Sequence, residues 1–217
     1  PIHITRPMLP SIEQLVEKLK EVWDTKWLTN MGSQHRNLEL KLKEFLGVEN
    51  ISLFCNGTLA LQLGYQALGL TGEVITTPFT FPATVNSLIQ CDLKPIFCDI
   101  NSNDLNINFD LIEGMITSKT CAILPVHVFG NPCDVKMIES VAKKNNLKVI
   151  YDAAHAFGVE YDQKSIASFG DISMFSFHAT KLFHTIEGGA LTYGNNSLKE
   201  TLYLLKNFGI QDEEHVI

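Results

Sequence analysis

The sequence has no long apolar run, no paired cysteines and no cluster of basic residues, and each absence excludes a class of protein. No stretch approaches the roughly 18 apolar residues that a membrane span needs, and the first residues lack the basic-then-apolar pattern of a signal peptide. The 17 Lys and Arg residues are scattered among 24 Asp and Glu, for a formal net charge of −7. Nucleic-acid binding depends on clustered positive charge. We therefore expect neither a membrane protein nor a nucleic-acid-binding protein.

The five cysteines form no CxxC pair, and most of them lie inside apolar runs. An odd number without paired spacing favours reduced core cysteines of a cytoplasmic protein over a disulfide framework or a zinc site. The histidines give no better metal signal, because no spacing places two of them with an acid on one helix face. We predict no metal site and a cytoplasmic location.

From Ile51 onward, short apolar runs alternate with helical patterns, which is typical of a mainly parallel sheet covered by helices on both faces. The 217 residues, 45% of them apolar, suit one sizeable core. We predict an α/β three-layer sandwich with a mainly parallel, mixed central sheet. The expected strands are Ile51–Cys55, Val74–Thr77, Pro95–Asp99, Cys121–Val126, Val149–Asp152, Ile172–Phe177 and Gly189–Tyr193. The expected helices are 58–69, 83–91, 109–116, 134–145 and 197–207.

The N-terminal part lacks the alternation of strand and helix patterns that begins at Ile51. Residues 1–10 contain three prolines and no period, which indicates an extended arm, and Ser11 with Gln14 predicts a helix start. The apolar period of that helix fades near Asp24, and a second helix is expected to close at Gly47. We divide the chain into an arm and helix over residues 1–30 and a large domain over residues 31–217.

An acid and a lysine are expected at the ends of two strands of this sheet. The apolar run Leu147–Tyr151 ends at Asp152, where an open α/β sheet presents its ligand-binding edge. The strand-like segment Asp171–His178 leads to Lys181, and Glu187-Gly-Gly189 follows as a tight turn. Such a pair suits pyridoxal phosphate (PLP), whose aldehyde condenses with a lysine amine and whose ring nitrogen needs an acidic partner.

Further motifs strengthen this interpretation. They are Asn56-Gly57-Thr58, Thr77-Pro-Phe-Thr-Phe-Pro-Ala-Thr84, Pro125-Val-His-Val-Phe-Gly130, Asp152-Ala-Ala-His155 and Ser176-Phe-His-Ala-Thr-Lys181. In this order they resemble the DegT/DnrJ/StrS family of sugar nucleotide aminotransferases, which share the fold type I PLP-enzyme architecture. The run Lys181–Gly189 is most similar to members that aminate a dTDP-4-keto-6-deoxyhexose.

The resemblance implies a role for each site residue. Gly57 and Thr58, at the start of a helix, would bind the PLP phosphate together with Ser176, and Phe81 would stack over the pyridine ring. Asp152 would bond the protonated ring nitrogen. His155 would bond the phenolic oxygen or pack on the ring face, and Lys181 would hold the aldehyde and move the proton.

Each of these residues also has an ordinary structural interpretation. Thr58 or Asp152 would be a helix cap, Ser176 a strand serine, Phe81 a core aromatic, His155 a structural histidine and Lys181 a surface lysine.

The resemblance implies a homodimeric enzyme that transfers an amino group from L-glutamate to a nucleotide-linked 4-keto-6-deoxy sugar, for amino sugars of surface polysaccharides such as O-antigen. Family members are longer, and the C-terminal small domain that completes their substrate site would begin after Ile217. The alternatives are a PLP-dependent sugar dehydratase, a non-catalytic PLP-binding regulator and a non-enzymatic α/β binding module. Relatives that act as dehydratases carry histidine at the position of Lys181, so the lysine favours transamination.

Overall fold

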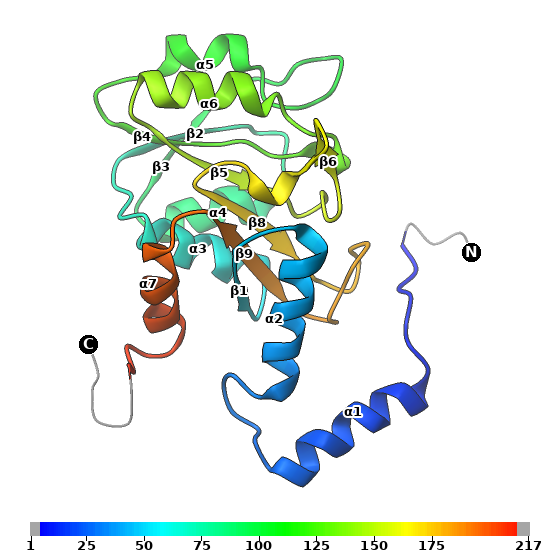
Figure 1. Cartoon of the computed structure of the whole chain (residues 1–217). Helices are drawn as coiled ribbons and strands as arrows, with labels where there is room; N and C mark the ends of the chain where they lie inside the picture. The colour runs from blue at the N-terminus through cyan, green and yellow to red at the C-terminus, as the bar shows by residue number, and fades with distance from the viewer. Residues whose placement is uncertain (1–4, 212–217) are drawn as a thin grey trace.

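The computed structural model describes residues 5–211 and consists of a central sheet between two layers of helices (Figure 1). The predictions for the first four residues of the arm and the last six of the large domain lie outside the described residues. Within them, residues 5–11 form neither helix nor strand, as expected of an extended arm. The division of the chain near residue 30 stays a prediction.

The central sheet has seven strands in the order β1-β9-β8-β5-β4-β2-β3. Five strands from β8 to β3 run parallel, and β9 runs antiparallel to both of its neighbours, β1 and β8. The predicted mainly parallel, mixed sheet is therefore confirmed. The strands are β1 (Asn50–Phe54), β2 (Glu73–Thr76), β3 (Lys94–Phe97), β4 (Thr120–Leu124), β5 (Lys148–Asp152), β8 (Ile172–Ser176) and β9 (Gly189–Tyr193).

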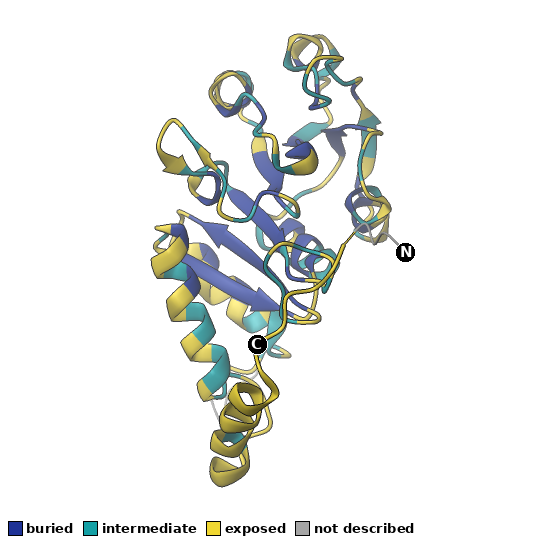
Figure 2. Cartoon of the chain, turned by 90° about the vertical axis from the view of Figure 1, so that its right-hand side faces the viewer, coloured by how far each residue is buried: buried dark blue, intermediate teal, exposed yellow. Residues whose placement is uncertain are grey.

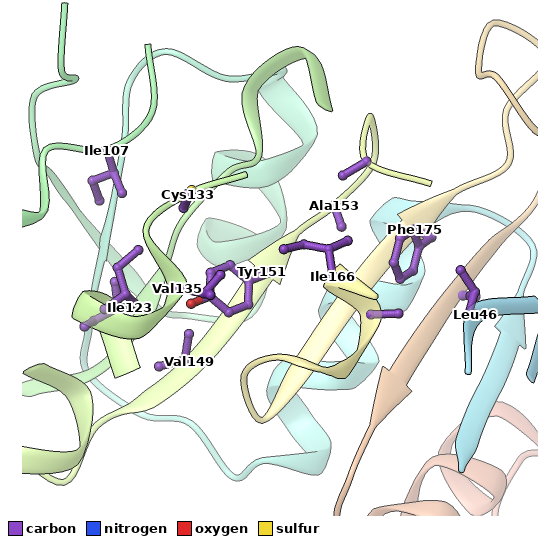
Figure 3. Packing of buried hydrophobic residues seen from close by; sticks show 14 of the residues in the cluster. Leu46, Ile107, Ile123, Cys133, Val135, Val149, Tyr151, Ala153, Ile166 and Phe175 are labelled. Atoms are coloured by element: carbon purple, nitrogen blue, oxygen red, sulfur yellow. The ribbon is translucent and has the colours of Figure 1, made fainter. Parts of the chain in front are cut away.

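Each face of the sheet buries its own apolar cluster against helices. One cluster packs the sheet against α3 (Gly57–Ala67), α4 (Pro82–Gln90) and α7 (Ser197–Lys206). The other packs it against α2 (Ser33–Leu46), α5 (Phe109–Met115) and α6 (Val135–Lys144). Figure 3 shows this second cluster, in which Tyr151 of β5 and Phe175 of β8 lie among aliphatic side chains. The three layers follow from burial of both faces of a mainly parallel sheet.

The N-terminal helix α1 (Ile12–Thr25) begins with the predicted capping box of Ser11 and Gln14. It has no buried residue, and the side chains of its apolar stripe, including Ile12 and Trp23, are exposed. In Figure 2 the central strands of the sheet are mostly dark blue, whereas α1 is yellow along nearly its whole length. The sequence thus predicts the helix correctly, but its apolar face does not contribute to the core of the described chain.

The predicted strands and helices are present, and their ends agree with the predicted ones to within two residues. Strand β4 ends at Leu124 because Pro125 has no N–H for the ladder, and Val126 makes only an isolated bridge to Asp152. The cap of α3 is Asn56 rather than Thr58, since Asn56 Oδ1 accepts the N–H of Leu59. The sequence missed two-residue strands, β6 (Glu160–Tyr161) and β7 (Lys164–Ser165), and the short helices η1 (Val128–Gly130) and η2 (Ile166–Ser168). These elements are too short to show a period.

The cysteines and the helix lengths bear on the class of protein. All five cysteines have free thiols; Cys98 and Cys133 are buried, whereas Cys55 is exposed. The prediction that the cysteines are core residues is therefore confirmed for Cys98 and Cys133 and wrong for Cys55, whereas Cys91 and Cys121 are partly buried. Among the described residues, no helix combines the length and the apolar character that crossing a bilayer requires.

The start of β9 lies in close backbone contact with the start of α3. A Cβ atom added to Gly189 would lie 2.5 Å from the carbonyl carbon of Asn56 and 2.6 Å from the nitrogen of Gly57. Real Cβ atoms do not approach backbone so closely, so only glycine allows the start of β9 to lie against the start of α3.

We therefore expect Gly189→Ala to lower the free energy of unfolding by about 1–3 kcal/mol, the usual cost of overpacking. Gly114→Ala in α5 is the matched control, because a Cβ there meets no atom within 4 Å. Alanine also has the higher helix propensity, so this control should be neutral or stabilising by up to about 1 kcal/mol. Urea unfolding of both variants measures the difference, and equal stabilities would contradict the packing argument.

Candidate active site

A cavity of about 490 Å³ lies at the edge of the sheet where the parallel strands end. This volume is within the range of roughly 300–1,000 Å³ that small-molecule sites occupy. Strands β1, β4, β5 and β8 point their carboxyl ends toward it, and the antiparallel β9 begins there. The cavity brings together all the residues that the sequence analysis proposed for a site: Gly57, Thr58, Phe81, Asp152, His155, Ser176 and Lys181.

Asp152 is the buried acid of this cavity, with only 5% of its surface exposed. Its Oδ2 accepts a hydrogen bond from Thr84 Oγ1 (2.7 Å), and its Oδ1 accepts the N–H of Ala154 (3.1 Å). Burial raises the pKa of Asp152, and the hydrogen bond from Thr84 opposes that shift most strongly. Asp152 caps no helix, because the bond to Ala154 forms a turn within the loop after β5.

Lys181 lies in the segment between β8 and β9, where its N–H donates to the carbonyl of His178 (2.8 Å). The side chain lines the cavity and is half-buried rather than fully exposed. Burial lowers the pKa of Lys181, and the negative charge of Asp152 partly opposes this shift. The amine is therefore easier to deprotonate than an ordinary lysine, as a nucleophile or a base requires.

His155 follows Asp152 on the loop after β5 and stacks on Phe129, with ring centroids 6.1 Å apart and planes 6° apart. Burial and the nearby charge of Lys181 lower the pKa of His155. Its ring is therefore neutral near neutral pH and offers both a donor and an acceptor nitrogen.

The start of α3 supplies hydrogen-bond donors to the cavity. Asn56 accepts the N–H groups of Leu59 and Ala60, through its side chain and its carbonyl respectively. Within the described residues this leaves the N–H groups of Gly57 and Thr58 without an acceptor, at the positive end of the helix. Ser176, at the end of β8, lines the same cavity. Together they form a suitable place for an anion.

Phe81 is not the core aromatic of the alternative interpretation, because 71% of its surface is exposed. It is the residue before α4 and lines the cavity. Phe79 and Phe129 are also exposed and form an edge-to-face pair with centroids 6.3 Å apart. Exposed aromatic rings beside a cavity are typical of a surface that a ligand or another chain covers.

The sequence analysis missed the roles of Thr84, His178 and Glu187, which also line the cavity. Thr84 is the last residue of the motif Thr77–Thr84, but only the fold brings it to Asp152, 68 positions away. Thr80 Oγ1 lies 2.8 Å from Thr84 Oγ1 and extends this chain of hydroxyl groups. No pairwise spacing in the sequence signals a contact across so many residues.

Comparisons with known proteins agree with this geometry. A model of the DegT/DnrJ/EryC1/StrS aminotransferase family matches residues 11–216. The chain belongs to this family. It is 54% identical to a dTDP-4-amino-4,6-dideoxy-D-glucose transaminase from Shigella dysenteriae, over 100% of this chain and 59% of that protein.

Two solved structures superpose closely on the chain. The crystal structure of DesI in the presence of its TDP-sugar product has a TM-score of 0.94 and 37% identity, and the alignment covers 97% of this chain and 54% of that one. NtdA from Bacillus subtilis, with bound cofactor PMP, has a TM-score of 0.88 and 29% identity, covering 100% of this chain and 52% of that one. The chain thus spans between 52% and 59% of the length of these three proteins.

The hydrogen bond from Thr84 should control the pKa of Asp152. We expect Thr84→Val, which removes the hydroxyl at nearly constant volume, to raise the pKa of Asp152 further, because the carboxylate then loses a hydrogen bond that favours its charged form. Thr84→Ser keeps the hydroxyl and should leave that pKa unchanged. Carbon-13 NMR titration of labelled aspartate, with Asp152→Asn to assign the signal, measures both; an unchanged titration in Thr84→Val would refute the assignment.

The amine of Lys181 should titrate below the ordinary lysine value of 10.5. Only the neutral amine reacts with acetic anhydride, so labelling of Lys181 should rise with pH through a lower midpoint than labelling of Lys136, whose pKa is raised by the hydrogen bond that it donates to Asp162. Because Asp152 raises the pKa of Lys181, Asp152→Asn should move the Lys181 midpoint to still lower pH. Mass spectrometry of the labelled peptides follows each residue, and an upward shift in Asp152→Asn would contradict the sign.

Proposed function

We propose that this chain binds pyridoxal phosphate and is the cofactor-binding part of an aminotransferase acting on nucleotide-linked sugars. The observation that carries the proposal is the shared cavity of Asp152 and Lys181, a buried acid and a lysine of lowered pKa. Membership of the aminotransferase family and the bound PMP of NtdA support the same cofactor.

The residues present fit this cofactor part by part. An acid suits a protonated pyridine nitrogen, and Asp152 is a buried carboxylate with oxygen lone pairs left over after its bonds to Thr84 and Ala154. The N–H groups of Gly57 and Thr58 and the hydroxyl of Ser176 suit the phosphate. The exposed face of Phe81 suits a stacked ring, and neutral His155 suits a phenolic oxygen.

When bound, the cofactor supplies an electron-poor ring that accepts the electron pair left at the α-carbon of an amino acid after its proton is removed. Asp152 would hold the ring nitrogen in its protonated form by a charge-assisted hydrogen bond. The amine of Lys181 would hold the aldehyde carbon in the resting enzyme. The same amine would act as the base that takes the proton from the α-carbon of the donor.

We propose L-glutamate as the amino donor and a dTDP-linked 4-keto-6-deoxy sugar as the acceptor, for amino sugars of surface polysaccharides such as O-antigen made in the cytoplasm. The support for the acceptor is the 54% identity with the Shigella transaminase, named for a dTDP-4-amino-4,6-dideoxy sugar. Relatives that act as dehydratases carry histidine at the position of Lys181, so the lysine favours amination.

We also propose a homodimer with the cavity at its interface. Among the described residues that line the cavity, Lys181 is the one basic side chain other than histidine, and Asp152 and Glu187 are acidic. A donor carboxylate and a nucleotide diphosphate need further cations, which a second subunit would supply. The exposed rings of Phe79, Phe81 and Phe129 support a contact with another chain beside the cavity.

The proposal predicts covalent attachment of the cofactor at one lysine. Added PLP should give a new near-visible absorbance band, and borohydride should then fix the cofactor on Lys181, as read by peptide mass spectrometry. Lys181→Ala should lose the adduct, and any transamination should fall by at least about 10²- to 10⁴-fold, the range for loss of an acid–base catalyst. Lys164→Ala, on β7, is the matched control and should behave as the wild type.

Substrate choice needs a separate assay. The chain with PLP, L-glutamate and a panel of dTDP-, UDP- and GDP-linked keto sugars should form 2-oxoglutarate and aminated sugar in equal amounts with the preferred acceptor. Attachment of the cofactor to another lysine, or an unchanged adduct in Lys181→Ala, would contradict the assignment of Lys181 in the attachment experiment. Equal turnover of all acceptors in the substrate panel would contradict only the proposal of a dTDP-linked sugar.

A further inference from the structure

The segment Phe177–Gly188 joins β8 to β9 and carries Lys181. Its base is closed by two hydrogen bonds, from the N–H of Phe177 to the carbonyl of Gly188 (2.8 Å) and from the N–H of Thr185 to the carbonyl of Phe177 (2.9 Å). Ile186 within it has a φ of 69°, a region that a β-branched residue rarely adopts. The segment therefore holds a conformation that its own contacts must stabilise.

His178 makes several of those contacts. Its Nδ1 accepts the N–H of Thr180 (3.2 Å) and lies 2.8 Å from the hydroxyl of the same residue. A backbone N–H can only donate, so Nδ1 carries no proton in this arrangement and the neutral ring has its proton on Nε2. That Nε2 lies 3.5 Å from Glu187 Oε1. The ring therefore bridges the residue before Lys181 and the residue before the Gly188-Gly189 turn.

The Glu187 end of this bridge adjoins two closely packed glycines. A Cβ on Gly188 would lie 2.2 Å from Thr185 Oγ1, and Gly189 lies against Asn56 and Gly57 at the start of α3. The Lys181 end has fewer restraints, because Thr180 is exposed and Lys181 only half-buried. Contacts from His178 thus connect Lys181 to the closely packed turn at Gly188 and Gly189.

We infer that His178, supported by Glu187, is a positioning residue for Lys181. Both line the same cavity as the lysine. His178 acts through Thr180 and through its own carbonyl, which accepts the N–H of Lys181, and exchanges no proton with the reacting atoms. The inference rests on the proposed function and deepens it.

The test measures how fast borohydride traps PLP on Lys181 in the whole chain, together with the apparent affinity for PLP and the unfolding temperature. We expect His178→Ala to slow trapping by about tenfold, as the loss of two orienting hydrogen bonds implies. Glu187→Ala should slow it by about threefold, because an exposed pair at this distance is weak. Unfolding temperatures should shift by less than about 4 °C, since these exposed contacts contribute little to stability.

Two variants distinguish positioning from a general structural effect. In His178→Asn the side-chain oxygen can accept the N–H two residues on, as in an Asx turn, so trapping should return to within about threefold of the wild type. His184→Ala is the matched control: His184 Nδ1 likewise accepts the N–H of Ile186 (3.3 Å) in the same segment, but outside the cavity. Trapping should be unchanged in it.

Wild-type trapping in His178→Ala, an equally slow His178→Asn, or an equal loss in His184→Ala would each overturn the inference. Should His178→Ala fail to fold, His178→Phe takes its place, because it keeps a ring without the accepting nitrogen. Wild-type trapping in that variant would likewise overturn the inference. Absence of trapping on Lys181 in the wild type would instead overturn the proposed function, so the two failures are distinguishable.

Discussion

The buried carboxylate of Asp152 is the constraint on which the site depends. A carboxylate out of water must be hydrogen-bonded, and its partners here come from different parts of the chain: Thr84 at the start of α4 and Ala154 beyond β5. The backbone of Asp152 also exchanges hydrogen bonds with the loop after β4, donating to Pro125 and accepting from His127. The connections that follow β2, β4 and β5 therefore meet at Asp152, which lines the cavity.

A neutral, stacked histidine, His127, lines the cavity beside Asp152. His127 lies parallel to Tyr151, with ring centroids 4.8 Å apart, and its Nδ1 accepts the N–H of Cys133 (3.0 Å). Burial lowers the pKa of His127 to about 3, so the ring stays uncharged at any physiological pH. Because this ring is uncharged, the charges that act on one another across the cavity are those of Asp152, His155 and Lys181.

The pKa values of Asp152 and Lys181 are shifted in opposite directions by the same cause. Burial favours the neutral form of each, raising the pKa of Asp152 and lowering that of Lys181, and the charge of each partly restores the other. An acid and an amine held in this way are prepared for a ligand that carries a positive ring nitrogen at one end and an electrophilic carbon at the other. The aminotransferase family to which the chain belongs uses a cofactor of that kind.

Much of the fold could be predicted from the sequence because its signals are local. The apolar runs of β1 to β5 and the capped amphipathic pattern of α6 depend on neighbours within one element, and their positions were right to within two residues. Asp152 and Lys181 could likewise be proposed, because parallel strands bring their carboxyl ends to one edge, whereas the roles of Phe81, His155 and Ser176 were implied by the resemblance to the family. The sequence by itself thus determined the α/β class, the strands, and which residues lie at that edge.

Only the tertiary structure decided how those residues contact each other. Thr84 reaches Asp152 across 68 positions, and Gly189 must be glycine because Asn56 lies against it. The exposure of Phe81 and of the apolar stripe on α1 was equally undetermined, since the same apolar pattern is compatible with a core or with a surface. Local patterns fix the direction of a backbone, whereas distances between side chains on different strands depend on how the whole sheet twists and packs.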